Sequence, residues 1–402
     1  EGYMESRPCR GYFVSHLDEL VETGPSGAEE METTAEPDAG WRVDFSPRGI
    51  DLDSFPYHVW RKLSRNTLVD DNKEMFHSGN HQGEPGLREA IRSYLHSARG
   101  VNCSPEQIIV GAGSEYLLML LSQILEGKHV IAMENPTYKQ AYRVFRSLDY
   151  EVCPVEMDAN GMEPELLTRS GANVAYVMPS HQFPTGVVMP VGRRQELLKW
   201  AVEAPDRYII EDDYDSEFRY RGKPIPALQG MDRSGRVIYL GTFSKCIAPA
   251  IRVSYLVLPT HLLLRYRSQT SFYASTVSRI DQNILYQFLA GGYFERHLNR
   301  MRAVYKTKHD LLLEQIEPLR ERFEIRGEHA GIHILLTSRQ GESEEQLIQK
   351  AEEAGVKVYG LSSYFIHPQH NHRPATVVLG YASLSEEQIV EGIRLLMECW
   401  GA

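Results

Sequence analysis

The sequence lacks the features that mark membrane and secreted proteins. No apolar run approaches the roughly 18 residues of a membrane-spanning helix, and the first residues show no signal-peptide pattern. The five cysteines are odd in number and scattered, without CxxC or CxxxC spacing, which indicates reduced thiols rather than a disulfide framework or a zinc site. We therefore expect a cytoplasmic protein with no membrane association.

Positive charge is also scarce. The chain has 43 Lys and Arg against 54 Asp and Glu, a net charge of -11, whereas a general nucleic-acid surface needs clustered basic side chains. Residues 11–41 contain no Lys or Arg, and eight acidic residues fall between Asp18 and Asp38. Low hydrophobicity, charge of one sign and Gly/Pro breaks predict an extended acidic linker over residues 16–42.

The length of 402 residues exceeds the usual ceiling for a single hydrophobic core, so two or more packed units are expected. Residues 1–15 alternate apolar and polar positions around the turn Arg7-Pro-Cys-Arg-Gly11, which predicts a short hairpin. Because isolated hairpins are marginally stable, we expect this one to belong to a domain whose bulk is missing from the chain.

From about residue 104, short apolar segments alternate with helical patterns. This alternation predicts an α/β fold with a mostly parallel central sheet that is covered on both faces. After a long helical region, from about 280 to 319, the pattern becomes that of a smaller α+β unit, with capping boxes at Ser343 and Ser385. The expected strands are Ile108–Val110, Val130–Met133, Glu151–Met157, Asn173–Met178, Tyr208–Glu211, Val237–Gly241 and Ser254–Leu258.

Two segments end strands in chemically useful groups. Gly241-Thr-Phe-Ser-Lys245, followed by Arg252, suits an amine that forms an imine near a phosphate, although a solvated lysine explains the segment equally simply. Tyr208–Asp215 ends an apolar strand in carboxylates, at the edge where open α/β sheets bind ligands. A carboxylate there could pair with a protonated pyridine nitrogen, but a metal site or a plain acidic loop also fits.

Two further segments carry weaker signals. Val110-Gly-Ala-Gly-Ser-Glu115 could bring backbone N–H groups at a helix N-terminus close to a phosphate, or could simply be a tight turn. Glu134-Asn-Pro-Thr-Tyr138 ends a strand before an aromatic residue, which could stack on a flat ring or serve packing alone.

Together and in this order, the four segments resemble the fold-type I pyridoxal 5′-phosphate (PLP) enzymes of the aspartate-aminotransferase group, from about Val43 to the C-terminus. The resemblance implies PLP as cofactor, a mostly parallel central sheet with a smaller α+β domain, and a homodimer. It implies an N-terminal segment (43–80) packing with the small domain, a large PLP-binding domain (81–285), and an interdomain helix with the small domain (286–402). Further matches are Asp44-Phe-Ser-Pro-Arg-Gly49, Gly83-x-x-Gly86-Leu-Arg88, Pro179-Ser-His-Gln-Phe-Pro-Thr-Gly186 and Leu379-Gly-Tyr-Ala382.

The resemblance also implies individual roles. Lys245 would be the catalytic residue and form the Schiff base with PLP, and Tyr138 would stack on the ring. Asp212 would face the pyridine nitrogen and Tyr214 the phenolic oxygen. The phosphate would be held by Ser114, Glu115 (through its backbone N–H), Thr242, Ser244 and Arg252. The group normally has Asn directly before Pro-Thr-Gly, where this chain has Phe183, so the tuning of the imine pKa is expected to differ.

Within that group, the sequences of residues 180–186 and 211–218 resemble those of the MocR/GabR-type bacterial regulators, in which an aminotransferase-like domain follows a GntR-type winged helix-turn-helix. Residues 1–14 resemble the last wing hairpin of that DNA-binding domain. The hypothesis is an effector-binding and dimerisation domain that reaches DNA only through a winged helix-turn-helix missing from this chain. Formation of an external aldimine with the effector amine would release Lys245 and favour a closed small domain.

In the GABA-responsive member of this family two arginines grip the effector carboxylate, and the matching residues here are Gln140 and Ser363. Each lost charged hydrogen bond costs on the order of 1.5–3 kcal/mol, so GABA is disfavoured. Arg373 and His181 remain candidate effector contacts. The expected effector is a small amino acid, with D-alanine favoured by likeness to the regulator of D-alanine–D-alanine ligase.

Some alternatives stay open. The chain could be a catalytically competent PLP-dependent aminotransferase or lyase, or an α/β binding protein without PLP. His367-Pro-Gln-His370-Asn-His372 has metal-like spacing, but a Pro- and Asn-rich turn explains it as well, and we expect no metal. Ser78 stands where a neighbouring subunit usually lends a tyrosine to the phosphate, so His77 or His81 could replace that contact.

Overall fold

The computed structural model describes residues 4–14, 40–68, 73–220, 225–367 and 374–401, which belong to two compact units, Glu1–Gly40 and Trp41–Ala402. The first unit contains the predicted hairpin: β1 (Met4–Arg7) pairs antiparallel with β2 (Gly11–Val14). Gly11 has a φ of +89°, which suits glycine at the end of the turn. Most of the predicted linker lies outside the described residues, and its assignment stays a prediction.

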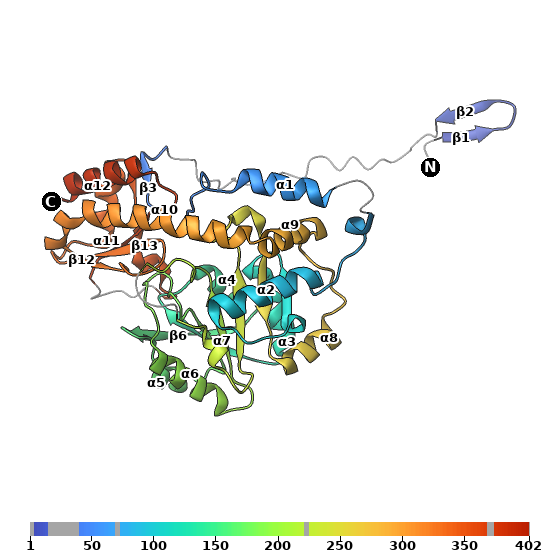
Figure 1. The fold of residues 1–402 in the computed structure, drawn as a ribbon, viewed down its shortest axis with the longest axis horizontal. Helices are drawn as coiled ribbons and strands as arrows, with labels where there is room; N and C mark the ends of the chain where they lie inside the picture. Colours follow the sequence, from blue (N-terminus) through green and yellow to red (C-terminus); the bar gives the residue numbers. More distant parts are fainter. Residues whose placement is uncertain (1–3, 15–39, 69–72, 221–224, 368–373, 402) are drawn as a thin grey trace. The chain divides into compact units, whose positions relative to one another are not determined.

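The second unit is built on an eight-stranded sheet (Figure 1). Five neighbouring strands run parallel, in the order β10-β9-β8-β5-β6, and β11 lies antiparallel between β10 and β4. The predicted mostly parallel sheet is therefore confirmed. The strands, in sheet order, are β4 (Ile108–Gly111), β11 (Ser254–Val257), β10 (Val237–Thr242), β9 (Tyr208–Asp213), β8 (Val174–Val177), β5 (Val130–Asn135), β6 (Glu151–Asp158) and β7 (Gly161–Met162).

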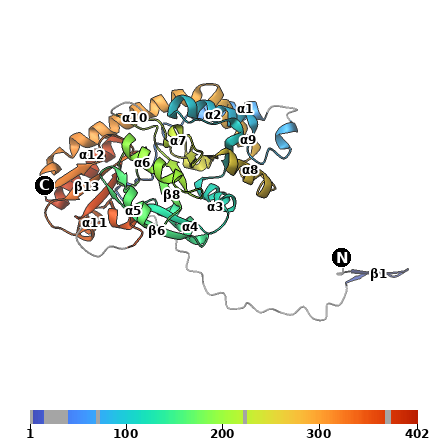
Figure 2. The same cartoon turned by 90° about the horizontal axis from the view of Figure 1, so that it is seen from below.

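Both faces of this sheet are covered, which is why its central strands are apolar at successive positions. Ile210 and the other apolar residues on its face of the sheet pack against α3 (Ser114–Leu125), α4 (Lys139–Ser147) and α8 (Thr260–Gln269). The neighbouring Ile209 points to the other face. That face is covered by α5 (Pro164–Arg169), α6 (Val191–Val202) and α7 (Leu228–Met231), and farther along by α2 (Pro85–Arg99) and α9 (Arg279–Ala290). Figure 2 shows α2 and α9 on the opposite side from α3 and α4.

The 23-residue α10 (Tyr293–Gln315) runs from α9 to a smaller α+β part, at the left of Figure 1. We call this part, residues 317–401, the small subdomain. Its antiparallel sheet has the order β12 (Phe323–Arg326), β13 (His333–Ser338), β16 (Thr376–Gly380), β15 (Tyr359–Gly360). Its helices α11 (Glu344–Glu353) and α12 (Glu386–Trp400) begin at the two predicted capping boxes, which both form.

The N-terminal segment of this unit joins the small subdomain to the large sheet. β3 (Val43–Asp44) pairs with β14 (Val356–Lys357), Phe45 is fully buried, and the Gly380 N–H donates to the Phe45 carbonyl. A Cβ at Gly380 would fall 2.2 Å from the Ser46 carbonyl oxygen, so glycine allows this close approach. Farther along, α1 (Tyr57–Thr67) reaches α9 through a Thr67–Asn283 hydrogen bond. The short 3₁₀ helices are Lys73–Phe76, Pro105–Gln107, Pro249–Ile251, Glu317–Glu321 and Leu361–Tyr364.

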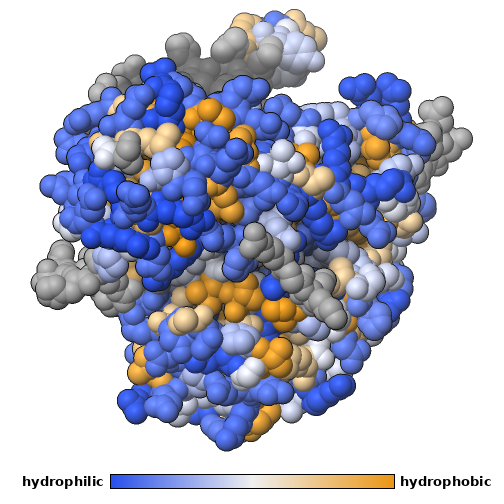
Figure 3. Space-filling model, turned by 60° about the vertical axis from the view of Figure 1, so that its left-hand side comes forward, coloured by the Kyte–Doolittle hydropathy of each residue, from blue (hydrophilic) through white to orange (hydrophobic). Residues whose placement is uncertain are grey.

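The surface is mostly hydrophilic, with apolar residues gathered across the middle of the face in Figure 3. Within the described ranges no helix is both long and apolar enough to cross a membrane.

We expect Phe45→Ala to lower the free energy of unfolding by about 3–5 kcal/mol, because it leaves a cavity where the N-terminal segment meets the small subdomain. Chemical denaturation followed by tryptophan fluorescence measures the change. Val390→Ala on α12, at a side chain 40% exposed, is the control and should cost less than about 0.5 kcal/mol. An equal effect of the two substitutions would contradict the anchoring role of Phe45.

Candidate functional site

A cavity of about 190 Å³ lies at the carboxyl ends of β9 and β10. It brings together all nine side chains that the sequence predicts around a cofactor: Ser114, Glu115, Tyr138, Asp212, Tyr214, Thr242, Ser244, Lys245 and Arg252. Parallel strands place their ends at one edge of a sheet, so segments more than 100 residues apart in the chain meet here.

Lys245 follows β10 and is partly buried in the cavity. Its Nζ donates to the carbonyl oxygen of Arg48 at 2.9 Å and lies 3.4 Å from that of Pro47. Burial lowers the pKa of Lys245 to about 8; the carboxylate of Asp215 opposes this shift and the Arg48 cation adds to it. More of the amine is therefore unprotonated near neutral pH than in an exposed lysine, as a nucleophile requires.

Asp212, near the end of β9, is 6% exposed and accepts a hydrogen bond from the buried Tyr176 hydroxyl. Burial raises the pKa of Asp212 to about 7; the Tyr176 bond lowers it, and the charges of Asp213 and Asp215 raise it further. A cationic group in the cavity would reverse this shift, because opposite charges nearby favour the ionised carboxylate. The site is thus suited to a ring whose nitrogen is protonated.

The opposite end of the cavity is suited to an anion. Ser114 and Glu115 begin α3, whose N-terminus carries partial positive charge, and the hydroxyls of Thr242 and Ser244 lie in the same lining. The Nη2 of Arg252 donates to Glu115 Oε2 at 3.2 Å and lies 3.4 Å from the Ala112 carbonyl oxygen. A Cβ at Gly113 would fall 2.5 Å from this Nη2, so the glycine leaves room for the guanidinium.

Three of the four predicted effector contacts lie outside the cavity lining. Gln140, on α4, and Ser363, whose Oγ donates to the Gly360 carbonyl at 2.8 Å, do not line the cavity. His181 lies behind Tyr214, 3.0 Å from its hydroxyl, and also outside the lining. Arg373 lies outside the described residues, as do His370 and His372. Effector binding by these residues stays a prediction.

Sequence reasoning missed Arg48, which lines the cavity beside Lys245. The signal was present in the quoted motif Asp44–Gly49, whose one basic residue is Arg48. The motif carried no functional assignment, because only the fold brings the N-terminal segment to the strand ends. Phe183, in place of the usual Asn, also lines the cavity and packs edge-on against Tyr138 and Tyr214.

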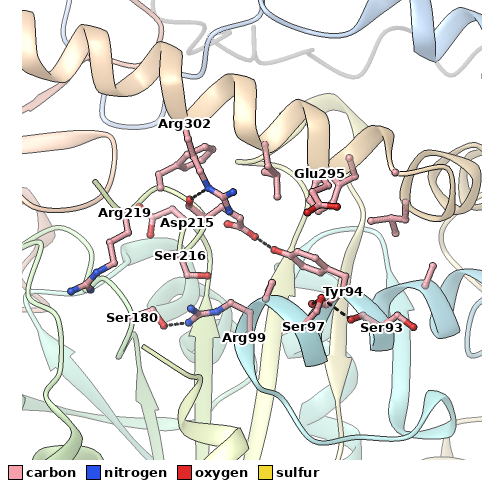
Figure 4. A pocket seen from close by; sticks show the side chains of 18 of the residues that line it. Ser93, Tyr94, Ser97, Arg99, Ser180, Asp215, Ser216, Arg219, Glu295 and Arg302 are labelled. Carbon is pink, nitrogen blue, oxygen red and sulfur yellow. Dashed lines mark hydrogen bonds between the residues drawn. The ribbon is translucent and has the colours of Figure 1, made fainter. Parts of the chain in front are cut away.

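A larger cavity of about 850 Å³ lies among α2, α9, α10 and the loop that follows β9 (Figure 4). Its wall holds Arg99, which pairs with Asp213 at 2.8 Å, and a 2.5 Å hydrogen bond from Tyr94 to Glu217. Neither Lys245 nor Asp212 lines it, so the smaller cavity is the better candidate for chemistry. In the part of the chain that is described, no group of three His, Cys, Asp or Glu side chains could hold a metal ion.

The family model for class I and II aminotransferases matches residues 51–395. The chain is similar to YdeL, an HTH-type transcriptional regulator of Bacillus subtilis (strain 168): 41% identity, covering 100% of this chain and 86% of YdeL. It is 33% identical to the probable rhizopine catabolism regulatory protein MocR of Rhizobium meliloti, covering 98% and 83% of the two chains. Among solved structures, the multiple substrate aminotransferase of Thermococcus profundus matches with a TM-score of 0.79 and 28% identity, covering 90% and 91%.

Aminotransferases of this kind depend on PLP, and the residues present fit it. The buried carboxylate of Asp212 has no side-chain cation bonded to it among the described residues, which suits the protonated ring nitrogen. The α3 N-terminus with Arg252 suits the phosphate, and the amine of Lys245 suits the aldehyde carbon.

Asp212→Asn is expected to stabilise the cofactor-free protein at pH 8 by at least about 1.4 kcal/mol, the equivalent of one pKa unit. The pKa of Asp212 is raised, so folding takes up a proton and stability is lost as pH rises from about 4 to about 7. Thermal unfolding at pH 5 and pH 8 measures this loss, which should be smaller in the variant than in the wild type; burial also raises the pKa of Glu134, Glu211 and Glu217 to about 7, so part of the loss remains. Asp53→Asn, at an exposed carboxylate, is the control. A wild-type pH dependence retained by the Asp212 variant would contradict the assignment.

Proposed function

Because this chain belongs to the class I and II aminotransferase family, and within it to the MocR type of helix-turn-helix regulators, we propose that it is the effector-binding and dimerisation domain of a bacterial transcription factor. It senses a small amino acid through PLP. The observation that carries the proposal is the gathering of nine predicted cofactor residues in one cavity, in a chain whose full length matches a transcriptional regulator.

Bound PLP supplies an aldehyde carbon that condenses with amines and a cationic ring that draws electrons from the bond formed there. Lys245 offers the amine, made more nucleophilic by burial. Asp212 would hold the positive charge on the ring nitrogen, Tyr214 would face the phenolic oxygen and Tyr138 would stack on the ring. The phosphate would be held by Arg252, the hydroxyls of Thr242 and Ser244, and the α3 N-terminus with Ser114 and Glu115.

The contacts of Lys245 suggest how a bound effector is signalled. When its amine is free, its hydrogen-bond acceptors are the Pro47 and Arg48 carbonyls of the N-terminal segment. That segment is tied to the small subdomain through Phe45 and β3. An effector amine that took the place of Lys245 on the cofactor would free the lysine amine to bond to these carbonyls of the N-terminal segment. That bond would favour a closed position of the small subdomain over an open one.

For the effector, we propose an amino acid short enough to place its carboxylate on Arg48, with D-alanine favoured. Arg48 lines the cavity, and its charge acts on both Lys245 and Tyr138, so one short ligand could present its amine to the cofactor and its carboxylate to Arg48. GABA, a longer amino acid, lacks arginine partners at Gln140 and Ser363. Arg373 stays a proposed second contact.

A homodimer is proposed on the resemblance to dimeric aminotransferases and on exposed apolar side chains. Met119 on α3, Leu264 on α8, and Phe272 and Tyr273 just after α8 are 45–75% exposed, as expected for a surface that another protein covers. DNA would be reached only through a winged helix-turn-helix, with β1–β2 as its wing and an acidic linker between. The proposed compartment is the cytoplasm.

A second candidate function is a working aminotransferase. It is favoured by the depressed pKa of Lys245 and by the structural match to a multiple substrate aminotransferase. Formation of keto acid from D-alanine at ordinary enzyme rates, of about 1 per second or faster, would favour this function over the regulator.

Borohydride reduction of the PLP-loaded protein, followed by peptide mass mapping, is expected to label Lys245, because reduction makes its bond to the cofactor irreversible. Lys245→Ala should lose both the label and the visible absorption band, and Lys350→Ala, at a surface lysine, should keep both. A label at another lysine would refute the proposed role of Lys245, and an unlabelled wild type would refute cofactor attachment.

Arg48→Gln is expected to weaken the absorption response to D-alanine about tenfold or more, because a charged hydrogen bond to the carboxylate is lost. Ethylamine, which is D-alanine without its carboxylate, should act equally on wild type and variant. Arg42→Gln, at an exposed arginine paired with Glu391, is the matched control. If Arg48→Gln weakened the response to ethylamine as much as the response to D-alanine, Arg48 would act on the cofactor rather than on the effector carboxylate. A response to GABA but not to D-alanine would overturn the proposed effector.

A further inference from the structure

Three side chains connect the cofactor cavity with the small subdomain. The Nδ1 of His181 lies 2.8 Å from Asp215 Oδ2 and 3.0 Å from the hydroxyl of Tyr214. His181 and Asp215 are 2% and 1% exposed, and they line the larger cavity, whereas Tyr214 lines the smaller one. The network therefore crosses the wall between the two cavities, near Asp215 in Figure 4.

The donors in this network are set by elementary chemistry. A carboxylate only accepts hydrogen bonds, so a bond between His181 and ionised Asp215 requires the proton on Nδ1. A protonated Nδ1 cannot accept from Tyr214, which leaves the hydroxyl hydrogen for Asp215 or for a group in the cavity. Burial, Asp215 and Asp212 all raise the pKa of Tyr214, so the hydroxyl keeps its proton and remains a donor.

The neighbouring histidine, His333, leaves this arrangement undisturbed. The His333 ring stands 5.3 Å from it, and burial, followed by the charges of His181 and Lys245, lowers the pKa of His333 to about 3. His333 is therefore neutral at physiological pH. Its Nε2 lies 2.8 Å from the Pro184 carbonyl oxygen, and this contact holds the start of β13 against the segment that carries His181.

The small subdomain also touches His181 through a glycine. A Cβ on Gly331, in the loop between β12 and β13, would fall 1.9 Å from His181 Cε1. Gly331 is itself held on both sides, since its N–H donates to the Phe218 carbonyl at 2.7 Å and its carbonyl accepts from the Tyr381 hydroxyl at 2.8 Å. The position of this loop thus determines where the imidazole can lie.

We infer that His181 is a positioning residue through which the loop of residues 327–332 sets the direction of the Tyr214 hydroxyl, and with it the hydrogen bond to the phenolic oxygen of PLP. The inference rests on the proposed function, in which Tyr214 faces that oxygen. It gives His181 a role other than touching the effector. Phe183 stands where the aminotransferase group has an Asn donor. The hydrogen bond from Tyr214 to the phenolic oxygen, and hence the position of its hydroxyl, therefore matters more here.

The pH midpoint of the visible absorption change of the PLP-loaded protein reports on this hydrogen bond. The Tyr214 hydroxyl stabilises the anionic oxygen, so without it the chromophore keeps its proton to higher pH. Tyr214→Phe should raise the midpoint by about one to two pH units. His181→Ala should raise it by roughly half of that shift, and His181→Asn should restore it, because the amide N–H can donate to Asp215.

A pair of glycine substitutions tests the loop without changing His181 or the cavity. Gly331 and Gly341 both lie in the small subdomain with nearly equal φ values, +78° and +76°, so alanine strains the backbone similarly at both. A Cβ at Gly341 meets nothing within 4 Å. Gly331→Ala should raise the midpoint as His181→Ala does, while Gly341→Ala should leave it unchanged.

The outcomes separate this inference from the proposed function. A wild-type protein without a visible band would refute both. A normal wild-type band with unchanged midpoints in His181→Ala and Gly331→Ala would overturn the inference alone, and so would an unchanged midpoint in Tyr214→Phe. A lower melting temperature without any change of midpoint would show that His181 has only a structural role, and would likewise overturn it. If His181→Ala fails to fold, Gly331→Ala decides.

Discussion

The structure depends above all on a carboxylate that is buried with no side-chain cation bonded to it in the described ranges. Asp212 sits at the end of a central parallel strand with a tyrosine hydroxyl as its hydrogen-bond partner, and burial pushes its pKa to about 7. Such a group costs stability unless a cation enters the cavity. The cavity around it supplies what a cationic, phosphate-bearing ring requires, from Lys245 on one side to the α3 N-terminus on the other.

Residues 211–215 contain four carboxyl groups, and each has different hydrogen-bond or ion-pair partners. Glu211 accepts from the backbone N–H groups of Leu228 and Gln229, at the start of α7. Asp213 pairs with Arg99 on the face opposite to Asp212, and Asp215, beyond the strand, bonds to His181. The two-residue period of the strand puts Asp212 on one face and Glu211 and Asp213 on the other, where each of these two carboxylates has partners of its own.

The N-terminal segment and the small subdomain meet the cavity through backbone atoms as much as through side chains. The Pro47 and Arg48 carbonyls receive the Lys245 amine, Gly380 admits Ser46 at close range, and Gly331 admits the His181 ring. Contacts of this kind allow little adjustment, because the backbone cannot move aside as a flexible side chain can.

The sequence by itself determined the α/β class and the capped helices α11 and α12, because strand periodicity and capping boxes are local signals. The resemblance of its strand-end motifs to the aminotransferase group indicated nine of the residues that line the cavity. Only the tertiary structure decided that Arg48 joins the cavity and that His181 lies behind Tyr214. It likewise placed Gln140 and Ser363 outside the cavity lining. These placements depend on how segments far apart in the chain pack together, which no local pattern encodes.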